Sequence, residues 1–353
     1  MLVFMCCLIV AQASDDGSGL GILFEPPSLE APRTYRLREA RAAYRTIARD
    51  FEIADRTNES LAPPPKGSKA KLIEYPSEVG DLDGYLYVPP GEGPFPAVVW
   101  ITGGLSNTIG VSVFEPPDPE NDQTGAAFRE AGFVVLYPAL RGGDGGQPGV
   151  IESYYGEVDD IIAAGEWLAK QPSVDNRLLV LAGHSNGATL SLLAAASSDR
   201  FDRVLAYGPR STLTLYGPKE TPYVLIADAD AVTQQKELEL RDPVRWINDI
   251  RTPVRVVEGE DFQTGVISDL VIEYATSNGY VENELVEGKD HFTVLYDATR
   301  SDAEAMSELY KQIKSGKVES DGSSETRPDD RNDDRNDDRN DDRNDDRNSE
   351  DAP

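Results

Sequence analysis

Two segments of this chain are apolar at every position, and they constrain the fold more than any other feature. Residues 97–101 and residues 178–181 contain no polar side chain. A strand with one solvated face would alternate apolar and polar residues, so these segments are expected to be covered on both faces. Strands of that kind occur in parallel sheets with helices on both sides, and they predict a doubly wound α/β domain.

The chain between residues 69 and 318 supports this fold class, because β-rich runs recur there and helical patterns separate the later ones. Strands are expected at 71–75, 82–88, 97–102, 133–137, 178–182, 203–207, 254–258 and 282–286. Helices are expected at 124–131, 158–170, 188–197, 265–277 and 302–314. Two early strands followed by repeated β–α units predict a mostly parallel, eight-stranded, doubly wound sheet that starts with antiparallel strands.

The charge and the scarcity of metal-binding residues exclude several classes of partner. The 353 residues include 34 basic and 63 acidic side chains, which gives a formal charge of −29. A chain so acidic repels nucleic-acid phosphates and anionic lipid surfaces, so we expect no nucleic-acid partner. Two cysteines and two histidines are too few for a structural zinc site built from these residues, and we expect no metal and no cofactor.

The first 13 residues are expected to form a signal peptide. They are mostly apolar and end in Ala11-Gln12-Ala13, a small-x-small cleavage site. We therefore expect an exported protein, periplasmic or secreted. The segment is too short to span a bilayer, so stable membrane insertion is not expected. Cleavage would remove Cys6 and Cys7, the two cysteines of the chain.

Two further segments flank the domain. Residues 14–68 are expected to form an N-terminal extension, with a helical rhythm over 33–57 and a Pro-rich linker at 61–68. Residues 319–353 contain 15 acidic and 6 basic side chains in repeats of Arg-Asn-Asp-Asp. A segment with so few apolar residues cannot bury enough surface to offset the entropy of ordering, so a disordered tail is predicted.

The motif that carries chemistry is Gly183-His-Ser185-Asn-Gly187, a G-x-S-x-G sequence between an apolar strand and an Ala/Leu-rich helix. The turn from strand to helix is so sharp that a Cβ at either glycine is expected to clash with neighbouring chain. Ser185 is expected at the carboxyl edge of the sheet and at a helix N-terminus, where backbone N–H groups point toward developing negative charge. Ser185 is therefore the candidate nucleophile.

A nucleophilic serine needs a base, and the chain contains two histidines. His184 is adjacent to Ser185, and its side chain is expected to point away from the nucleophile. His291 follows the predicted last strand and is the candidate base. A carboxylate should orient it. After the strand at 254–258, Asp261 is favoured, and Glu258 at the strand end is the alternative.

The oxyanion formed during such a reaction needs backbone N–H donors. The loop after the strand at 97–102 contains Gly103 and Gly104, and the residue after the nucleophile is Asn186. The N–H groups of Gly104 and Asn186 are the predicted oxyanion hole.

Together these segments resemble the α/β-hydrolases, in particular the branch of the prolyl oligopeptidase (peptidase S9) catalytic domain and the dienelactone hydrolases. The resemblance covers about residues 70–315 and rests on Pro96-Ala-Val-Val-Trp-Ile-Thr-Gly-Gly104, Leu140-Arg-Gly-Gly143, Gly156-Glu-Val-Asp-Asp160, Trp167-Leu-Ala-Lys-Gln-Pro-Ser-Val-Asp175, Gly183-His-Ser-Asn-Gly187 and His291.

This resemblance implies an α/β-hydrolase fold with a small cap insertion at about 209–250 and the chain order serine, acid, histidine. In the family pattern an Asp stands three residues after the strand-end Gly, where this chain has Phe262, so both candidate acids stay open. The resemblance also implies that Arg141 and Asp159 are scaffold residues.

The implied activity is that of a Ser-His-acid hydrolase acting through an acyl-enzyme, either an esterase or a small serine peptidase. Its substrate would be a small-molecule ester or a short peptide. A thiol-type dienelactone hydrolase is excluded because position 185 is Ser. The alternative is a non-catalytic binding protein with the α/β-hydrolase fold, and the presence of both Ser185 and His291 argues against it.

Overall fold

The computed structural model describes residues 37–44, 46, 61–104, 106–143, 146–213, 229–262, 272 and 279–317. The expected signal peptide and acidic tail lie outside these residues, as do most of the N-terminal extension and nearly all of the helix expected at 265–277. None of the described helices combines the length and the apolar character that a membrane-crossing helix needs.

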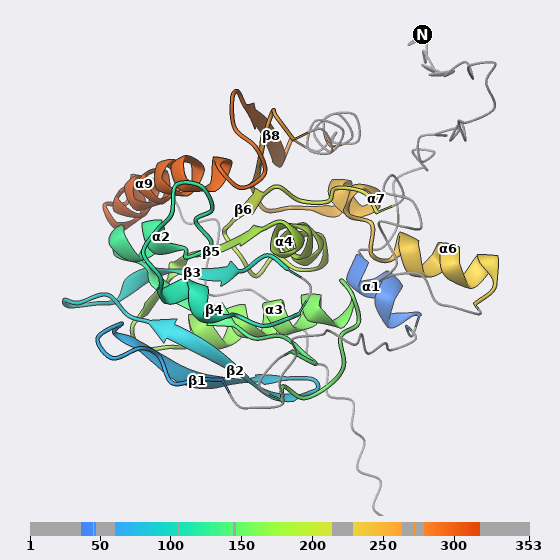
Figure 1. The fold of residues 1–353 in the computed structure, drawn as a ribbon, viewed down its shortest axis with the longest axis horizontal. Coiled ribbons are helices and arrows are strands. Elements are labelled where there is room, and N and C mark those ends of the chain that lie inside the picture. Colours follow the sequence, from blue (N-terminus) through green and yellow to red (C-terminus); the bar gives the residue numbers. More distant parts are fainter. Residues whose placement is uncertain are drawn as a thin grey trace, which may run out of the picture. The chain divides into compact units, whose positions relative to one another are not determined.

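In the described part of the chain, eight strands form one sheet in the order β1-β2-β4-β3-β5-β6-β7-β8 (Figure 1). The strands are β1 (Ala70–Ser77), β2 (Gly80–Tyr87), β3 (Phe95–Ile101), β4 (Val134–Pro138), β5 (Val174–His184), β6 (Arg203–Tyr207), β7 (Val254–Gly259) and β8 (Val281–Val286). The pairs β1–β2 and β2–β4 are antiparallel, and every other pair is parallel. The predicted mostly parallel sheet with an antiparallel start is therefore confirmed.

Helices flank the sheet. They are α1 (Leu37–Ala42), α2 (Ala126–Glu130), α3 (Gly156–Ala169), α4 (Asn186–Ser197), α6 (Ala231–Glu239), α7 (Pro243–Trp246) and α9 (Val294–Lys314), with short 3-10 turns η1 (Val111–Phe114) and η3 (Ile247–Asp249). Among the described residues, α6, α7 and η3 occupy the connection between β6 and β7, within the segment where the cap was expected.

The side chains of β5 alternate between two apolar clusters, one on each face of the sheet. Leu178, Val180 and Ala182 belong to one cluster, and Leu179 and Leu181 belong to the other. Helices α1, α3, α4 and α7 cover the face of Leu179, whereas α2 and α9 cover the opposite face (Figure 1). The uniformly apolar segments are thus buried on both sides, as their sequence predicts.

One helix begins earlier than its pattern indicated. Helix α9 starts at Val294, eight residues before the expected start at 302. Val294, Leu295 and Ala298 are buried at helical spacing and extend the apolar face toward the N-terminus. The β-branched residues Val294 and Thr299 weaken the local helix propensity there, but packing against the sheet outweighs that preference.

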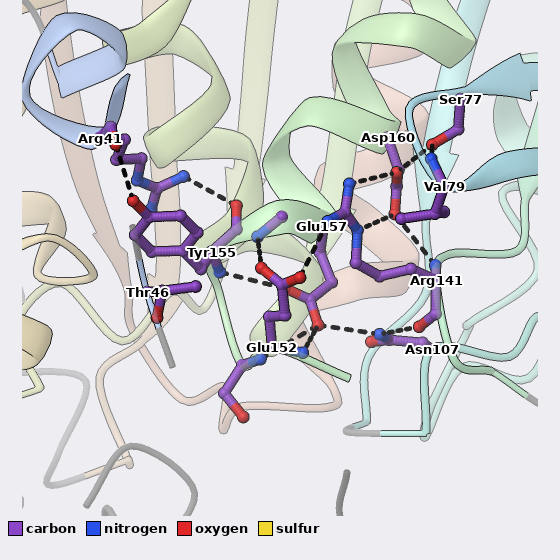
Figure 2. Close-up of polar contacts among 12 residues, drawn as sticks. Arg41, Thr46, Ser77, Val79, Asn107, Arg141, Glu152, Tyr155, Glu157 and Asp160 are labelled. Carbon is purple, nitrogen blue, oxygen red and sulfur yellow. Dashed lines mark hydrogen bonds and ion pairs between the residues drawn. The ribbon is translucent and has the colours of Figure 1, made fainter. Parts of the chain in front are cut away.

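A buried ion pair joins the turn after β4 to α3. Arg141 Nε and Nη2 donate to the two carboxylate oxygens of Asp160, each at 2.9 Å, and the backbone N–H of Arg141 donates to the same carboxylate at 3.0 Å (Figure 2). Ser77 Oγ, from β1, donates to Asp160 at 2.6 Å. The carboxylate of Asp160 therefore ties the turn after β4 to α3 and to the end of β1.

The parallel strands bring four chain segments to one edge of the sheet. In the register of β5, Gly183 lies opposite Ile101 of β3 and Ala206 of β6, and Tyr207 of β6 lies opposite Val257 of β7. The loops that follow these strands therefore meet at the carboxyl edge, where ligands bind in open α/β sheets.

Candidate active site

The chain turns sharply at Ser185, between β5 and α4. Ser185 has φ 55° and ψ −117°, a conformation that costs free energy for a residue with a Cβ. A Cβ at Gly183 would lie 2.6 Å from the carbonyl carbon of Gly187, and a Cβ at Gly187 would lie 2.4 Å from the carbonyl oxygen of Ile101. Only glycine fits at these two positions, so the strand can pass directly into the helix and present Ser185.

Ser185 is also the one residue of the stretch 181–190 that is not fully buried. Its backbone N–H donates to the carbonyl of Tyr207 at 2.8 Å, which ties the turn to the end of β6. A hydroxyl at a helix N-terminus, partly open and on a strained backbone, is the arrangement of a nucleophile elbow.

The candidate base lies beside the same chain segment. A Cβ on Gly208, the residue after Tyr207, would lie 2.6 Å from Cε1 of His291. Among the described residues, no hydrogen bond joins Ser185 Oγ to His291, and such contacts are commonly loose until substrate binds.

The carboxylate beside His291 is Glu258. Its Oε2 lies 3.0 Å from Nδ1 of His291, and its Oε1 accepts the N–H of Gly259 at 2.8 Å. The exposed fractions are 4% for Glu258 and 9% for His291, so water does not screen the contact strongly. A carboxylate only accepts hydrogen bonds, so Nδ1 carries the proton and Nε2 is left as the basic atom.

Asp261, the acid that the sequence favoured, lies elsewhere. Its side chain is exposed, and its backbone N–H donates to the carbonyl of Lys289 at 2.9 Å. Of the two candidate acids, Glu258 is the one whose side chain contacts His291, because the strand β7 continues to Gly259 and carries Glu258 to the sheet edge.

His184 contacts the segment that carries His291. Its Nδ1 lies 2.7 Å from Nε2 of Gln123, which can only donate, and its Nε2 lies 3.0 Å from the carbonyl oxygen of His291. His184 is therefore the neutral tautomer with the proton on Nε2. Burial and, secondarily, the neighbouring His291 lower the pKa of His184 to about 3.

Two phenylalanines surround the His291 ring. Phe262 is stacked on it, with centroids 4.7 Å apart, and Phe292 meets it edge-on at 5.0 Å. Phe292 is 47% exposed, which is unusual for a large apolar side chain beside a buried histidine. The surroundings of His291 are therefore apolar on the solvent side.

The predicted oxyanion donors lie in contact with the elbow. A Cβ on Gly103 would lie 3.4 Å from Cβ of Ser185, so the loop after β3 packs directly on the turn. Asn186 is the first residue of α4, and its N–H has no acceptor within the helix. Asn186 Nδ2 donates to the carbonyl of Gly104 at 3.1 Å and ties the two donor segments together.

Two residues of this site were not recognised in the sequence. The expectation for His184 is that it points away from the nucleophile, and its contacts with Gln123 and with the carbonyl of His291 were not predicted. Tyr154, whose hydroxyl donates to Oδ1 of Asn186, lies 32 residues before it, and no local pattern marks that contact. Within the described part of the chain, no three His, Cys, Asp or Glu side chains gather closely enough to hold a metal ion.

One part of this chain matches a known protein family. Residues 120–260 match the prolyl oligopeptidase family, peptidase S9. The matched segment includes Ser185 and Glu258 and ends before His291. No curated protein sequence matches the chain.

Solved structures show the same fold at low sequence identity. The 2,6-dihydroxy-pseudo-oxynicotine hydrolase superposes with a TM-score of 0.55 and 17% identity, over 70% of this chain and 68% of that one. A puromycin-hydrolyzing peptidase of Mycobacterium tuberculosis gives 0.54 and 20%, over 71% of this chain and 41% of its own length. This chain has the α/β-hydrolase fold, and its residues 120–260 are similar to the prolyl oligopeptidase family.

Proposed function

We propose that this protein is a serine hydrolase that cleaves an ester or peptide bond through an acyl-enzyme on Ser185. His291 is the general base and Glu258 is the acid that orients it. The observation that carries the proposal is the buried contact between Nδ1 of His291 and Oε2 of Glu258, at 3.0 Å, beside a strained serine at the sheet edge. The S9 family match of residues 120–260 supports it.

The first half of the reaction forms the acyl-enzyme. Nε2 of His291 takes the proton of Ser185 Oγ as Oγ attacks the carbonyl carbon of the substrate. The carbonyl oxygen becomes an oxyanion, which accepts hydrogen bonds from the N–H groups of Gly104 and Asn186. Glu258 stabilises the imidazolium. The tetrahedral species then expels an alcohol or amine, which takes the proton from His291.

The second half releases the acid. Water enters, His291 takes one of its protons, and the resulting hydroxide bonds to the acyl carbon. The second tetrahedral species breaks its bond to Ser185 Oγ, which regains the proton from His291. The net reaction consumes one water and needs no cofactor.

The substrate proposed is a small ester or a short peptide. Phe262 and Phe292 place apolar surface beside His291, which favours an uncharged group next to the scissile bond. The net charge of −29 disfavours anionic substrates at long range.

The test is turnover of p-nitrophenyl acetate and of an aminoacyl p-nitroanilide by the purified protein. Ser185→Ala and His291→Ala should each lower kcat by several orders of magnitude, because serine without its base is a weak nucleophile. Ser315→Ala, which changes an exposed serine after α9, is the matched control and should leave kcat unchanged. A folded wild-type protein that hydrolyses neither substrate would favour the non-catalytic binding protein.

A further inference from the structure

The loop of residues 152–155, just before α3, is held by two buried arginines. All four of its backbone carbonyls accept hydrogen bonds from guanidinium groups. Arg241 donates to the first two carbonyls, at 3.0 and 2.7 Å, and Arg41 donates to the last two, at 2.6 and 2.9 Å. The loop therefore has little freedom to rotate its peptide groups.

The N–H groups of the same loop are held by one carboxylate. Glu157, which is 1% exposed, accepts the N–H groups of residues 152, 153 and 155 at 2.7, 3.0 and 3.1 Å (Figure 2). Ser153 and Tyr154 have φ angles of 54° and 67°, in the left-handed region. Two consecutive residues with a Cβ remain there only when their surroundings impose it.

The arginines are themselves locked in place. The ring of Tyr155 contacts both guanidinium groups, with its centroid 4.7 Å from Cζ of Arg41 and 4.9 Å from Cζ of Arg241. Glu237 of α6, which is fully buried, pairs with Arg241 and accepts the hydroxyl of Tyr44 at 2.9 Å. Arg41 comes from α1, so the N-terminal extension is built into this cluster.

The conformation of the loop 152–155 brings the side chain of Tyr154 into contact with Asn186, one of the two predicted oxyanion donors. The hydroxyl of Tyr154 donates to Oδ1 of Asn186, and Nδ2 of Asn186 donates to the carbonyl of Gly104 at 3.1 Å. Because the amide oxygen is occupied by Tyr154, the amide nitrogen must face the Gly104 carbonyl. The two N–H donors lie on separate chain segments, and this contact links them.

We propose that Tyr154 is a positioning residue for the oxyanion hole, which fixes the Asn186 side chain and through it the place of Gly104 relative to Ser185. The N-terminal extension takes part, because Arg41 holds the backbone of Tyr154. This inference rests on the proposed function. It predicts that the hydroxyl of Tyr154 acts in the transition state, where the oxyanion forms, more than in substrate binding.

The test removes that hydroxyl with Tyr154→Phe. On p-nitrophenyl acetate, kcat should fall by about tenfold or more while KM stays within about twofold. Tyr75→Phe is the matched control, because Tyr75 is also buried and its hydroxyl donates to a carbonyl, that of Ala139, at 2.6 Å. Both variants should lose similar stability in thermal unfolding, and only Tyr154→Phe should lose kcat.

A double-mutant cycle separates positioning from general loosening. If Tyr154 acts through the Asn186 side chain, Tyr154→Phe should have little further effect on kcat in an Asn186→Ala background, which keeps the backbone N–H. Additive losses, or a Tyr154→Phe variant with wild-type kcat, would overturn the inference while leaving the proposed function intact. An inactive wild-type protein would overturn both.

A last variant tests the part of the N-terminal extension. Arg41→Lys keeps the charge, but a lysine cannot reach the carbonyls of Tyr154 and Tyr155 together. We therefore expect kcat to fall, as it should in Tyr154→Phe. An unchanged kcat would show that the N-terminal extension does not help to position Tyr154.

Discussion

Nδ1 of His291 lies 3.0 Å from Oε2 of Glu258, and both side chains are buried at the carboxyl edge of the sheet. Glu258 also accepts the N–H of Gly259 with its other oxygen. The carboxylate is therefore held in one orientation, and it in turn fixes the ring of His291 and the tautomer that the proposed reaction needs.

The identity of the acid can be tested with two isosteric changes. Glu258→Gln should lower kcat on p-nitrophenyl acetate by roughly 10³-fold or more, because an amide at that position no longer stabilises the imidazolium. Asp261→Asn changes an exposed side chain in the turn that follows β7 and should leave kcat within about twofold. Equal losses in the two variants would contradict the assignment.

His184 gives a pH-dependent prediction. Its pKa in the folded state is about 3, against an ordinary value of 6.5. The unfolded chain therefore binds a proton at His184 as the pH falls below 6.5, whereas the folded chain does not. The contribution of this group to stability is fully present above pH 6.5 and is lost as the pH falls toward 3.

The measurement is urea unfolding of wild type and of His184→Gln between pH 4 and pH 8. Glutamine keeps an N–H donor for the carbonyl of His291 but does not titrate. The free energy of unfolding of the variant should fall less on acidification than that of wild type. Parallel pH profiles would show that His184 is not a neutral buried group.

Gly208 tests how closely the chain approaches His291. Gly208→Ala should abolish most activity, because the new Cβ would lie 2.6 Å from the His291 ring and 2.8 Å from Oε2 of Glu258. Gly132→Ala is the control: Gly132 also has a positive φ, 87°, but its Cβ would meet nothing within 4 Å. Both changes cost stability through the backbone, so a loss of kcat in Gly208→Ala alone reports the contact with the site.

The pair Arg141–Asp160 should dominate the stability of the scaffold on the α3 side. Asp160→Asn removes the carboxylate that holds Arg141 through two guanidinium nitrogens and leaves Glu152 as its remaining ion-pair partner, and it should lower the free energy of unfolding by about 3 kcal/mol. Glu308→Gln breaks an exposed ion pair with Lys311 on α9 and should cost less than about 1 kcal/mol. Urea titration of both variants checks the difference.

Much of the fold could be predicted from the sequence, because its signals are local. The apolar runs of β3 and β5 indicate strands that are buried on both faces. The glycines around Ser185 indicate the sharp turn from strand to helix. The acid was harder to assign, because the choice between Glu258 and Asp261 depends on where β7 ends. That end is set by the pairing of β7 with β8, which the local sequence does not reveal.

The contacts around Tyr154 could not be predicted at all. Arg41 reaches the Tyr154 carbonyl across 113 residues, and the Tyr154 hydroxyl reaches Asn186 across 32. No periodicity or motif encodes such pairs, because they depend on how α1 and the loop before α3 pack in three dimensions.

The most direct test of the proposed triad is covalent labelling with a fluorophosphonate, followed by mass spectrometry of the digested protein. The probe reacts with a serine only when a base and an oxyanion hole activate it. We expect one adduct, on the peptide that contains Ser185, and its loss in both Ser185→Ala and His291→Ala. Absence of labelling in the folded wild-type protein, or an adduct that persists in Ser185→Ala, would contradict it.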